Sequence, residues 1–403
     1  MKAVQKAVQI EPKNYDFDKI IDRYHTSCLK WDFNQRTFGR EDILPMWVAD
    51  MDFPAPEAVV EALVNRAKHG IYGYSDGMEG YYGVLIDWMK ERHGWEIQRD
   101  WISFSPGIVP ALNELVRSLT KAGDKILVQF PVYPPFFQAV KNHGRELVGS
   151  QLILEKGRYT MDFADLEEKF FSGIKIMILC NPHNPVGRVW ERVELERLGQ
   201  LCLTHGVLVI SDEIHSDLIY KGYRHIPFAS LSPESALQSI VCTAPSKTFN
   251  LAGLQTSNLI IPNAKYRLAF RASLNLTGIH YPNVFGMTAM EAAYRHGRDW
   301  LDQLLDYLSG NLRFLNSFLD RELPQITAIQ PEGTYLVWLD FSALGMNPKA
   351  LQNFLVHEAG VGLSPGYLFG PGGEGFARLN IACARSVLEE GLQRIKTAVK
   401  GLE

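Results

Sequence analysis

Short apolar runs alternate with amphipathic stretches through the middle of the chain. The runs have the length of buried strands, and they lie at residues 125–130, 174–180, 207–211, 240–243 and 258–261. Between them, residues 110–120 and 191–205 carry apolar side chains at helical spacing, with charged residues on the other positions. Strands that are apolar at successive positions and alternate with helices predict a mostly parallel sheet covered by helices on both faces.

The pattern changes near residue 300. A long helical stretch at 300–319 is followed by a strand at 333–340, a helix at 348–359, a glycine-rich stretch at 366–375, a strand at 377–382 and a helix at 387–399. We therefore predict an α/β fold with a large domain at 56–298 and a smaller α+β domain at 299–403. The N-terminal segment 1–55, which ends in the apolar run 43–48, is expected to pack with the smaller domain.

Composition narrows the function classes. The chain has 403 residues, of which 46% are hydrophobic and 21% charged, and its net charge of −4 gives no support for a nucleic-acid or membrane surface. The first 13 residues lack the apolar core of a signal peptide, and no apolar run is long enough to span a bilayer. Five scattered cysteines without a Cys-x-x-Cys pair indicate buried thiols rather than a metal site. A cytoplasmic location is expected.

Three polar residues stand at the ends of successive predicted strands. Lys247 follows the run 239–243, Asn184 follows the strand at 174–180 within Asn-Pro-His-Asn-Pro-Val-Gly, and Asp212 begins Asp-Glu-Ile-His. Each has an ordinary explanation when taken alone: a solvated lysine, a turn at Asn184-Pro185 and a helix N-cap at Asp212. Ligands of open α/β sheets bind at the carboxyl ends of strands. The coincidence of all three therefore favours one site.

The three side chains suit an aromatic aldehyde phosphate. The Lys247 amine can form a Schiff base with the aldehyde and later move a proton. A buried Asp212 carboxylate needs a cationic partner, which a protonated pyridine nitrogen provides. Asn184 can donate its amide to the phenolate oxygen of the ring.

Two further strand ends complete this hypothesis. Tyr133, in Pro-Val-Tyr-Pro, offers a flat face for stacking on the ring, although it can equally be a core residue. Gly107, Ile108 and Val109 come just before the helix at 110–120, where free backbone N–H groups suit a phosphate. The glycine turn there can also be an ordinary loop.

The ordered set of Asn184-Pro185-Val186-Gly187, Asp212 and Lys247 in Ser-Lys-Thr-Phe-Asn-Leu-Ala-Gly resembles the fold type I pyridoxal-phosphate enzymes of the class I/II aminotransferase superfamily. The resemblance covers nearly the whole chain. It implies that Lys247 carries the cofactor, Asp212 pairs with the pyridine nitrogen and Asn184 binds the phenolate oxygen. It also implies that Arg378, in Phe-Ala-Arg-Leu-Asn, holds the substrate α-carboxylate through a bidentate fork. A surface salt bridge is the alternative reading of Arg378.

Two positions depart from the common pattern of that family. His215 stands where a tyrosine is usual, and Gln255 stands where an arginine usually grips the phosphate, which leaves Ser246 and the 107–109 turn to hold it. These departures, together with Lys30-Trp31-Asp32, the stretch 46–53 and Pro-Glu-Gly-Thr-Tyr at 331–335, resemble the bacterial C–S lyase branch, the MalY/PatB-type cystathionine β-lyases. His215 is expected beside the cofactor, where it either hydrogen-bonds the cofactor oxygen in place of the tyrosine or only packs nearby.

This branch resemblance implies β-elimination of L-cystathionine and related cysteine S-conjugates to pyruvate, ammonia and a thiol. An aminotransferase shares the first proton removal, and no single residue decides between the two reactions. Trp47, Tyr133 and Asn184 are expected beside the substrate with Arg378. The resemblance also implies a homodimer in which Tyr74 reaches the neighbour's phosphate, with Tyr72 as the competing candidate. A regulatory role through a protein partner stays open.

Overall fold

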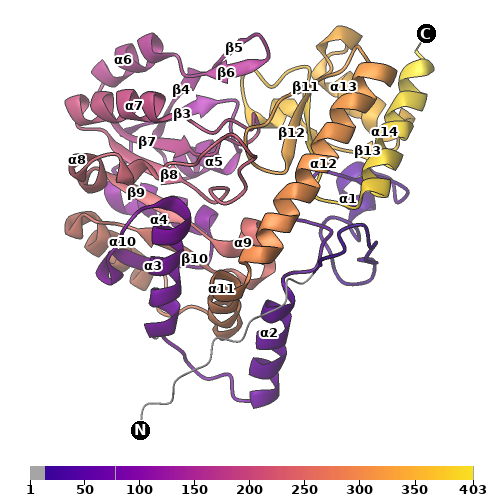
Figure 1. Ribbon diagram of the computed structural model, residues 1–403. Helices are drawn as coiled ribbons and strands as arrows, with labels where there is room; N and C mark the ends of the chain where they lie inside the picture. Colours follow the sequence, from indigo (N-terminus) through magenta and orange to yellow (C-terminus); the bar gives the residue numbers. More distant parts are fainter. Residues whose placement is uncertain (1–13, 78, 403) are drawn as a thin grey trace.

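The computed structural model describes residues 14–77 and 79–402, and it is organised around a seven-stranded sheet (Figure 1). The strand order is β2 (Ile102–Ser105), β10 (Ser257–Ile260), β9 (Ser239–Thr243), β8 (Leu208–Asp212), β7 (Ile174–Cys180), β3 (Lys125–Phe130) and β4 (Glu146–Gln151). β10 runs opposite to the other strands of this sheet, and the pairings that do not involve β10 are all parallel. The prediction of an α/β fold with a mostly parallel sheet is confirmed. Neither β2 nor β4 was predicted, since neither is a continuous apolar run.

Helices cover both faces of this sheet, which explains why its central strands are apolar at successive positions. Along β7, Ile176 and Ile178 join a core cluster with residues of α4 and α5, whereas Met177 and Leu179 join a second cluster with residues of α6 and α7. The helices of this part of the chain are α2 (Glu57–His69), α3 (Glu79–His93), α4 (Ile108–Leu119), α5 (Pro135–Asn142), α6 (Phe163–Phe171), α7 (Arg192–His205), α8 (Pro233–Leu237), α9 (Pro245–Thr248), α10 (Ala264–Leu276) and α11 (Val284–His296). A short hairpin, β5 (Ile153–Glu155) with β6 (Arg158–Thr160), lies outside the sheet.

The C-terminal part builds a second, antiparallel sheet. Its strand order is β11 (Thr327–Ile329), β12 (Leu336–Asp340), β15 (Phe376–Asn380) and β14 (Ser364–Pro365). Its helices are α12 (Arg298–Glu322), α13 (Pro348–Asn353) and α14 (Arg385–Lys400). The predicted helix at 348–359 is not uniform, because α13 passes into a π-helical turn at Phe354–Glu358. Figure 1 shows α12 running from beside α11 to the small sheet.

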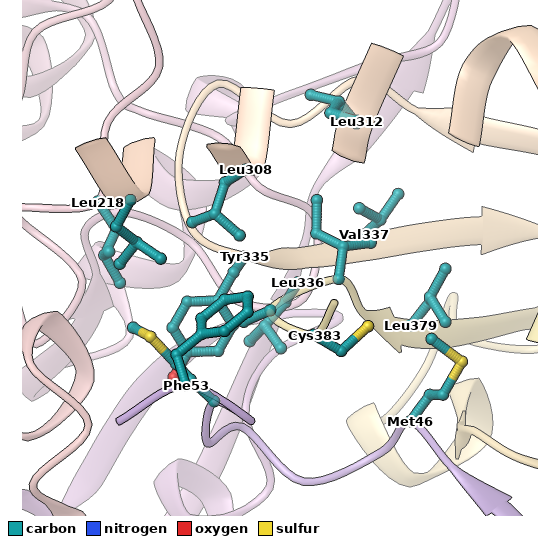
Figure 2. Close-up of a cluster of buried hydrophobic side chains, with 14 of the residues drawn as sticks. Met46, Phe53, Leu218, Leu308, Leu312, Tyr335, Leu336, Val337, Leu379 and Cys383 are labelled. Carbon is teal, nitrogen blue, oxygen red and sulfur yellow. The ribbon is translucent and has the colours of Figure 1, made fainter. Parts of the chain in front are cut away.

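The segment before α2 lies along this C-terminal part. It contains α1 (Asn34–Phe38) and β1 (Leu44–Pro45), which pairs in parallel with β13 (Val361–Gly362). Figure 2 shows Met46 and Phe53 of this segment in one apolar cluster with Leu308 of α12 and Val337 of β12. The division into 1–55, 56–298 and 299–403 stays a proposal, and its residues 1–13, 78 and 403 lie outside the described part. None of the described helices combines the length and the apolar character needed to span a membrane.

Candidate active site

A cavity opens at the carboxyl ends of the parallel strands of the large sheet. Its lining brings together most of the predicted site residues and several others: Ala49, Pro106, Gly107, Ile108, Val109, Tyr133, Cys180, Asn184, Asp212, Ile214, His215, Ala244, Ser246, Lys247, Ala252, Gln255, Thr256 and Ser257. The loops and turns after β2, β3, β7, β8 and β9 each contribute. Because β10 runs antiparallel, its first residue, Ser257, lies at the same edge.

Asp212 is the last residue of β8 and lies between two cysteines on the neighbouring strands. Its register partners are Cys180 on β7 and Cys242 on β9. The carboxylate is buried and accepts a backbone hydrogen bond from Ile214 to Oδ1 at 3.1 Å. Burial raises the pKa of Asp212 to about 7. No described helix begins at this residue, so the N-cap explanation does not hold. A buried carboxylate in this setting fits a cationic partner in the cavity.

Lys247 sits in α9, the turn that follows β9. Its Nζ donates to the carbonyl oxygen of Ala49 at 2.6 Å, and the hydroxyl of Tyr335 donates to the same oxygen at 3.0 Å. Burial, assisted by the Arg378 cation, lowers the pKa of Lys247 to about 8, against the opposing charges of Asp50 and Asp212. The unprotonated amine, which a nucleophile or base requires, is therefore far more abundant near neutral pH than in an ordinary lysine.

Arg378 lies on β15 and is 5% exposed, which argues against a surface salt bridge. Its Nη1 donates to Oδ1 of Asn184 at 2.9 Å, and its Nη2 donates to the carbonyl of Trp47 at 2.9 Å and to Oγ of Ser364 at 3.2 Å. These acceptors are all neutral, and its Nε is buried without a partner in the described structure. Burial lowers the pKa of Arg378 to about 10. A buried guanidinium with neutral partners suits an anionic ligand.

The Arg378 contact also orients Asn184. Since Oδ1 of Asn184 accepts from the guanidinium, the amide NH₂ is the group that this side chain has left for a ligand. Beside it, the backbone N–H of Tyr133 donates to the carbonyl of Asn184 at 3.1 Å, which ties the loop after β3 to the loop after β7. The carboxylate-binding and ring-binding candidates thus form one connected unit.

His215 is buried in the same lining. Burial and the nearby cations Lys247 and Arg378 lower the pKa of His215 to about 3, so the imidazole is neutral at neutral pH. Its Nδ1 is buried and has no hydrogen-bond partner in the described structure, and its ring lies 6.1 Å from that of Tyr335. The imidazole therefore has one nitrogen to offer to a bound group.

The other end of the cavity is built from backbone N–H groups and hydroxyls. Gly107 precedes α4, so the N–H groups of Ile108 and Val109 lie in the first helical turn and lack intrahelical acceptors. Ser246 and Gln255 line this end, and Gln255 is exposed with a left-handed φ of 47°. Among the described lining residues, Lys247 is the single lysine or arginine. This end therefore offers an anion neutral donors.

Three predicted site residues do not line the cavity: Arg378, which reaches its wall through Asn184, and Trp47 and Tyr74. The Trp47 indole packs edge-on against Phe38, with ring centroids 5.9 Å apart, and only its backbone carbonyl reaches Arg378. Tyr74 is 99% exposed on the loop before α3. Tyr72 is 55% exposed, and its hydroxyl donates to the carbonyl of Ala67 at 2.6 Å.

Sequence reasoning missed Ala49, Thr256 and Ser257 as lining residues. Ala49 acts through its backbone carbonyl, and an alanine carries no side-chain chemistry that would single it out. The position of Ser257 follows from the antiparallel direction of β10, which an apolar run does not reveal.

Comparison with known proteins extends these observations. The family model "Aminotransferase class I and II" matches residues 41–395. The cystathionine beta-lyase PatB of Bacillus subtilis is 49% identical over 95% of this chain and 100% of its own length. Cystalysin of Treponema denticola, whose crystal structure contains pyridoxal 5'-phosphate, superposes with a TM-score of 0.95 at 40% identity, covering 97% of this chain and all of that one. A C-S lyase of Staphylococcus hominis with bound pyridoxal phosphate gives 0.90 at 38% identity, covering 96% and 98%.

Proposed function

The chain belongs to the family of class I and II aminotransferases, and we propose that within it the protein is a pyridoxal-phosphate-dependent C–S lyase of the cystathionine β-lyase type. The substrates are L-cystathionine and related cysteine S-conjugates, and the products are pyruvate, ammonia and a thiol. The observation that carries this proposal is one cavity that holds a buried carboxylate at Asp212 and a lysine with a lowered pKa, with a buried arginine near its wall.

The residues present fit the cofactor. Asp212 is a buried carboxylate suited to a protonated pyridine nitrogen, and the free amide of Asn184 and the unpaired nitrogen of His215 are available to the phenolate oxygen. The 107–109 turn and Ser246 offer donors for the phosphate, and Tyr133 contributes a ring to the lining. Bound pyridoxal phosphate supplies an electron sink that stabilises negative charge at the substrate α-carbon.

The side chains of this protein perform the remaining work. Arg378 binds the α-carboxylate of the substrate and fixes the direction of the α-hydrogen. Lys247 removes that hydrogen as a proton at Nζ, and the carbonyl of Ala49 receives the resulting ammonium group. Burial of Lys247 keeps the proton inside the cavity, where it is available to the sulfur as the C–S bond breaks. Because Arg378 and Asn184 are hydrogen-bonded to each other, the residue proposed to bind the substrate carboxylate and the residue proposed to bind the cofactor ring keep a fixed distance during these steps.

The experiment that tests this reaction is incubation of the purified protein with pyridoxal phosphate and L-cystathionine, without a keto-acid acceptor. We expect equal amounts of pyruvate and free thiol over many turnovers. Conversion of the cofactor to its amine form, with no pyruvate, would instead identify an aminotransferase. A parallel reaction with added 2-oxo acid serves as the control, because a lyase gains nothing from an amino acceptor.

We also propose that the protein acts as a homodimer in which Tyr74 of one copy reaches the phosphate end of the other. The loop before α3 supports this proposal, because Ile71 is 68% and Tyr74 99% exposed, and the Tyr74 ring lies near the half-exposed Tyr281 at 6.3 Å. Sedimentation velocity tests the association, and a monomer at catalytic concentrations would refute it. The free cysteines support a proposed cytoplasmic location, where thiols stay reduced.

A further inference from the structure

The backbone of the segment 46–53 holds both cations of the site. The carbonyl of Trp47 accepts from Arg378, and two residues later the carbonyl of Ala49 accepts from Lys247 and from Tyr335. A carbonyl positions a cation only if the backbone that carries it is fixed. The contacts that fix this segment therefore bear on the geometry of the site.

Two asparagine side chains form hydrogen bonds with the backbone of this segment. Asn250, three residues after Lys247, accepts from the N–H of Met51 at 3.0 Å and donates to the carbonyls of Met51 and Phe53 at 2.9 Å each. Asn380, two residues after Arg378, donates to the carbonyls of Val48 and Asp50 at 2.6 Å each. The segment is thus bonded to the chain next to each of the two cations that it holds.

A cluster of four charged side chains, Arg23, Lys30, Asp50 and Asp52, supplies a third anchor. Nη2 of Arg23 lies 2.6 Å from Asp50, and Nη1 lies 2.6 Å from Asp52. Nζ of Lys30, which is 1% exposed, lies 2.6 Å from Asp52 and 3.9 Å from Asp50, and the indole N–H of Trp31 donates to Asp52 at 3.0 Å. The two cations and two carboxylates balance, which matters most for Lys30 and Asp52, the least exposed of the four.

We propose that this charge cluster is a positioning device for the reactive lysine: it fixes the segment 46–53 so that Ala49 receives the Lys247 amine, and it sets the negative charge that Asp50 presents to that amine. The proposal rests on the role of Lys247 as the cofactor-bearing residue. It assigns a role to Lys30, Trp31, Asp50 and Asp52, none of which lines the cavity.

The charges around Lys247 predict opposite effects for removing the Asp50 carboxylate and for removing the Arg23 cation. Asp50 and Asp212 favour the protonated form of Lys247, Arg378 disfavours it, and the rings of His215 and Tyr335 are neutral near pH 7. Removing the Asp50 carboxylate should therefore lower the proton affinity of the Lys247 nitrogen. Removing Arg23, which faces Asp50 together with Lys30, leaves that carboxylate less neutralised and should raise it.

The test is a pH titration of the absorption band of the holoenzyme, whose cofactor is bound at Lys247. We expect Asp50→Asn to move the midpoint down and Arg23→Met to move it up, each by roughly half a pH unit or more. Arg23→Lys should restore a midpoint close to that of the wild type. Arg40→Met is the matched control, since Arg40 pairs with Asp42 at 2.6 Å on the same N-terminal segment, outside the cluster.

Midpoints that move in the same direction would show that Asp50 does not act on the Lys247 nitrogen through its charge, and that result, or no shift in either variant, overturns the proposal. Asp50→Ser and Arg23→Gln give the same comparison if a first variant does not fold. A wild-type protein without a borohydride-reducible adduct at Lys247 would instead contradict the proposed function itself, so the two failures are distinguishable.

Discussion

The two ends of the cavity differ in structure. The ring end is the part lined by Asp212, Asn184 and His215, and the phosphate end is the part lined by residues 107–109, Ser246, Ala252 and Gln255. At the ring end, Asp212, Asn184 and His215 are buried at the ends of two adjacent parallel strands, and each is held by hydrogen bonds or by close packing. At the phosphate end, Ala252 and Gln255 are exposed, and the donors are backbone N–H groups and hydroxyls.

If the protein is the proposed dimer, this difference separates the part of the cavity that one copy of the chain completes from the part that a second copy would reach. The ring end controls charge, which requires groups fixed in a dry environment, since electrostatic effects weaken on contact with water. On the proposed function, the phosphate end would hold an anion at an open edge with neutral donors, where a group from a second copy could be added. We therefore expect substitutions at the ring end to affect the reaction itself, and substitutions at the phosphate end to affect cofactor retention.

The largest effect is expected at the boundary between the two ends. Lys247→Ala removes the amine that bonds the cofactor and moves the α-proton, so turnover should fall by more than roughly a thousandfold. Borohydride treatment followed by peptide mass analysis should find no reduced adduct, while the wild type carries it on Lys247. An adduct retained in the variant would place the anchor elsewhere.

Asp212→Asn tests the ring end with almost no change of shape. The amide cannot carry the negative charge that keeps a pyridine nitrogen protonated, so kcat should fall by about a hundredfold, ~2.7 kcal/mol in activation free energy. The equilibrium affinity for the cofactor should change much less than kcat. Equal losses in both quantities would mean that Asp212 is chiefly a cofactor-binding residue.

Tyr74→Phe tests the phosphate end and its proposed completion by a second copy. Loss of one phenol donor to a phosphate should weaken cofactor affinity by about tenfold, ~1.4 kcal/mol, and leave kcat at saturating cofactor within a few-fold. Tyr72→Phe is the matched control, because the Tyr72 hydroxyl already donates within its own chain to Ala67. Equilibrium dialysis distinguishes them, and a larger loss in the Tyr72 variant would reverse the assignment.

The sequence predicted the buried strands and the side chains at their ends better than the features that depend on the backbone. The strands β3 and β7 were predicted to the residue, because a strand buried on both faces is apolar at most successive positions. Asp212, Asn184 and Lys247 were gathered into one site by the strand-end rule, and the structure places all three in the cavity lining. What escaped prediction acts through the backbone or through direction: the carbonyl of Ala49, the antiparallel course of β10 and the contribution of Trp47 through its carbonyl.

Gln255→Arg should strengthen the open end. A guanidinium at this exposed position adds a charge-assisted donor toward the phosphate, so the dissociation constant of the cofactor should fall by roughly fivefold at low salt. Gln255→Met is the control for the left-handed backbone, since it keeps the size of the side chain without the charge. Equal affinities of the two variants would show that the phosphate lies out of reach of this side chain.

His215→Phe gives the smallest expected effect on the reaction and the sharpest view of the ring end. The pKa of His215 lies at about 3, so the imidazole stays neutral between pH 5 and 9 and cannot itself supply an inflection in that range. If its unpaired nitrogen contacts the cofactor oxygen, the phenylalanine variant loses that hydrogen bond, and the absorption maximum shifts while kcat changes within about threefold. An unchanged spectrum would leave His215 as a packing residue against Tyr335. An inflection near pH 6 that disappears in the variant would show instead that His215 titrates in the holoenzyme, so that its imidazole is not neutral throughout this pH range.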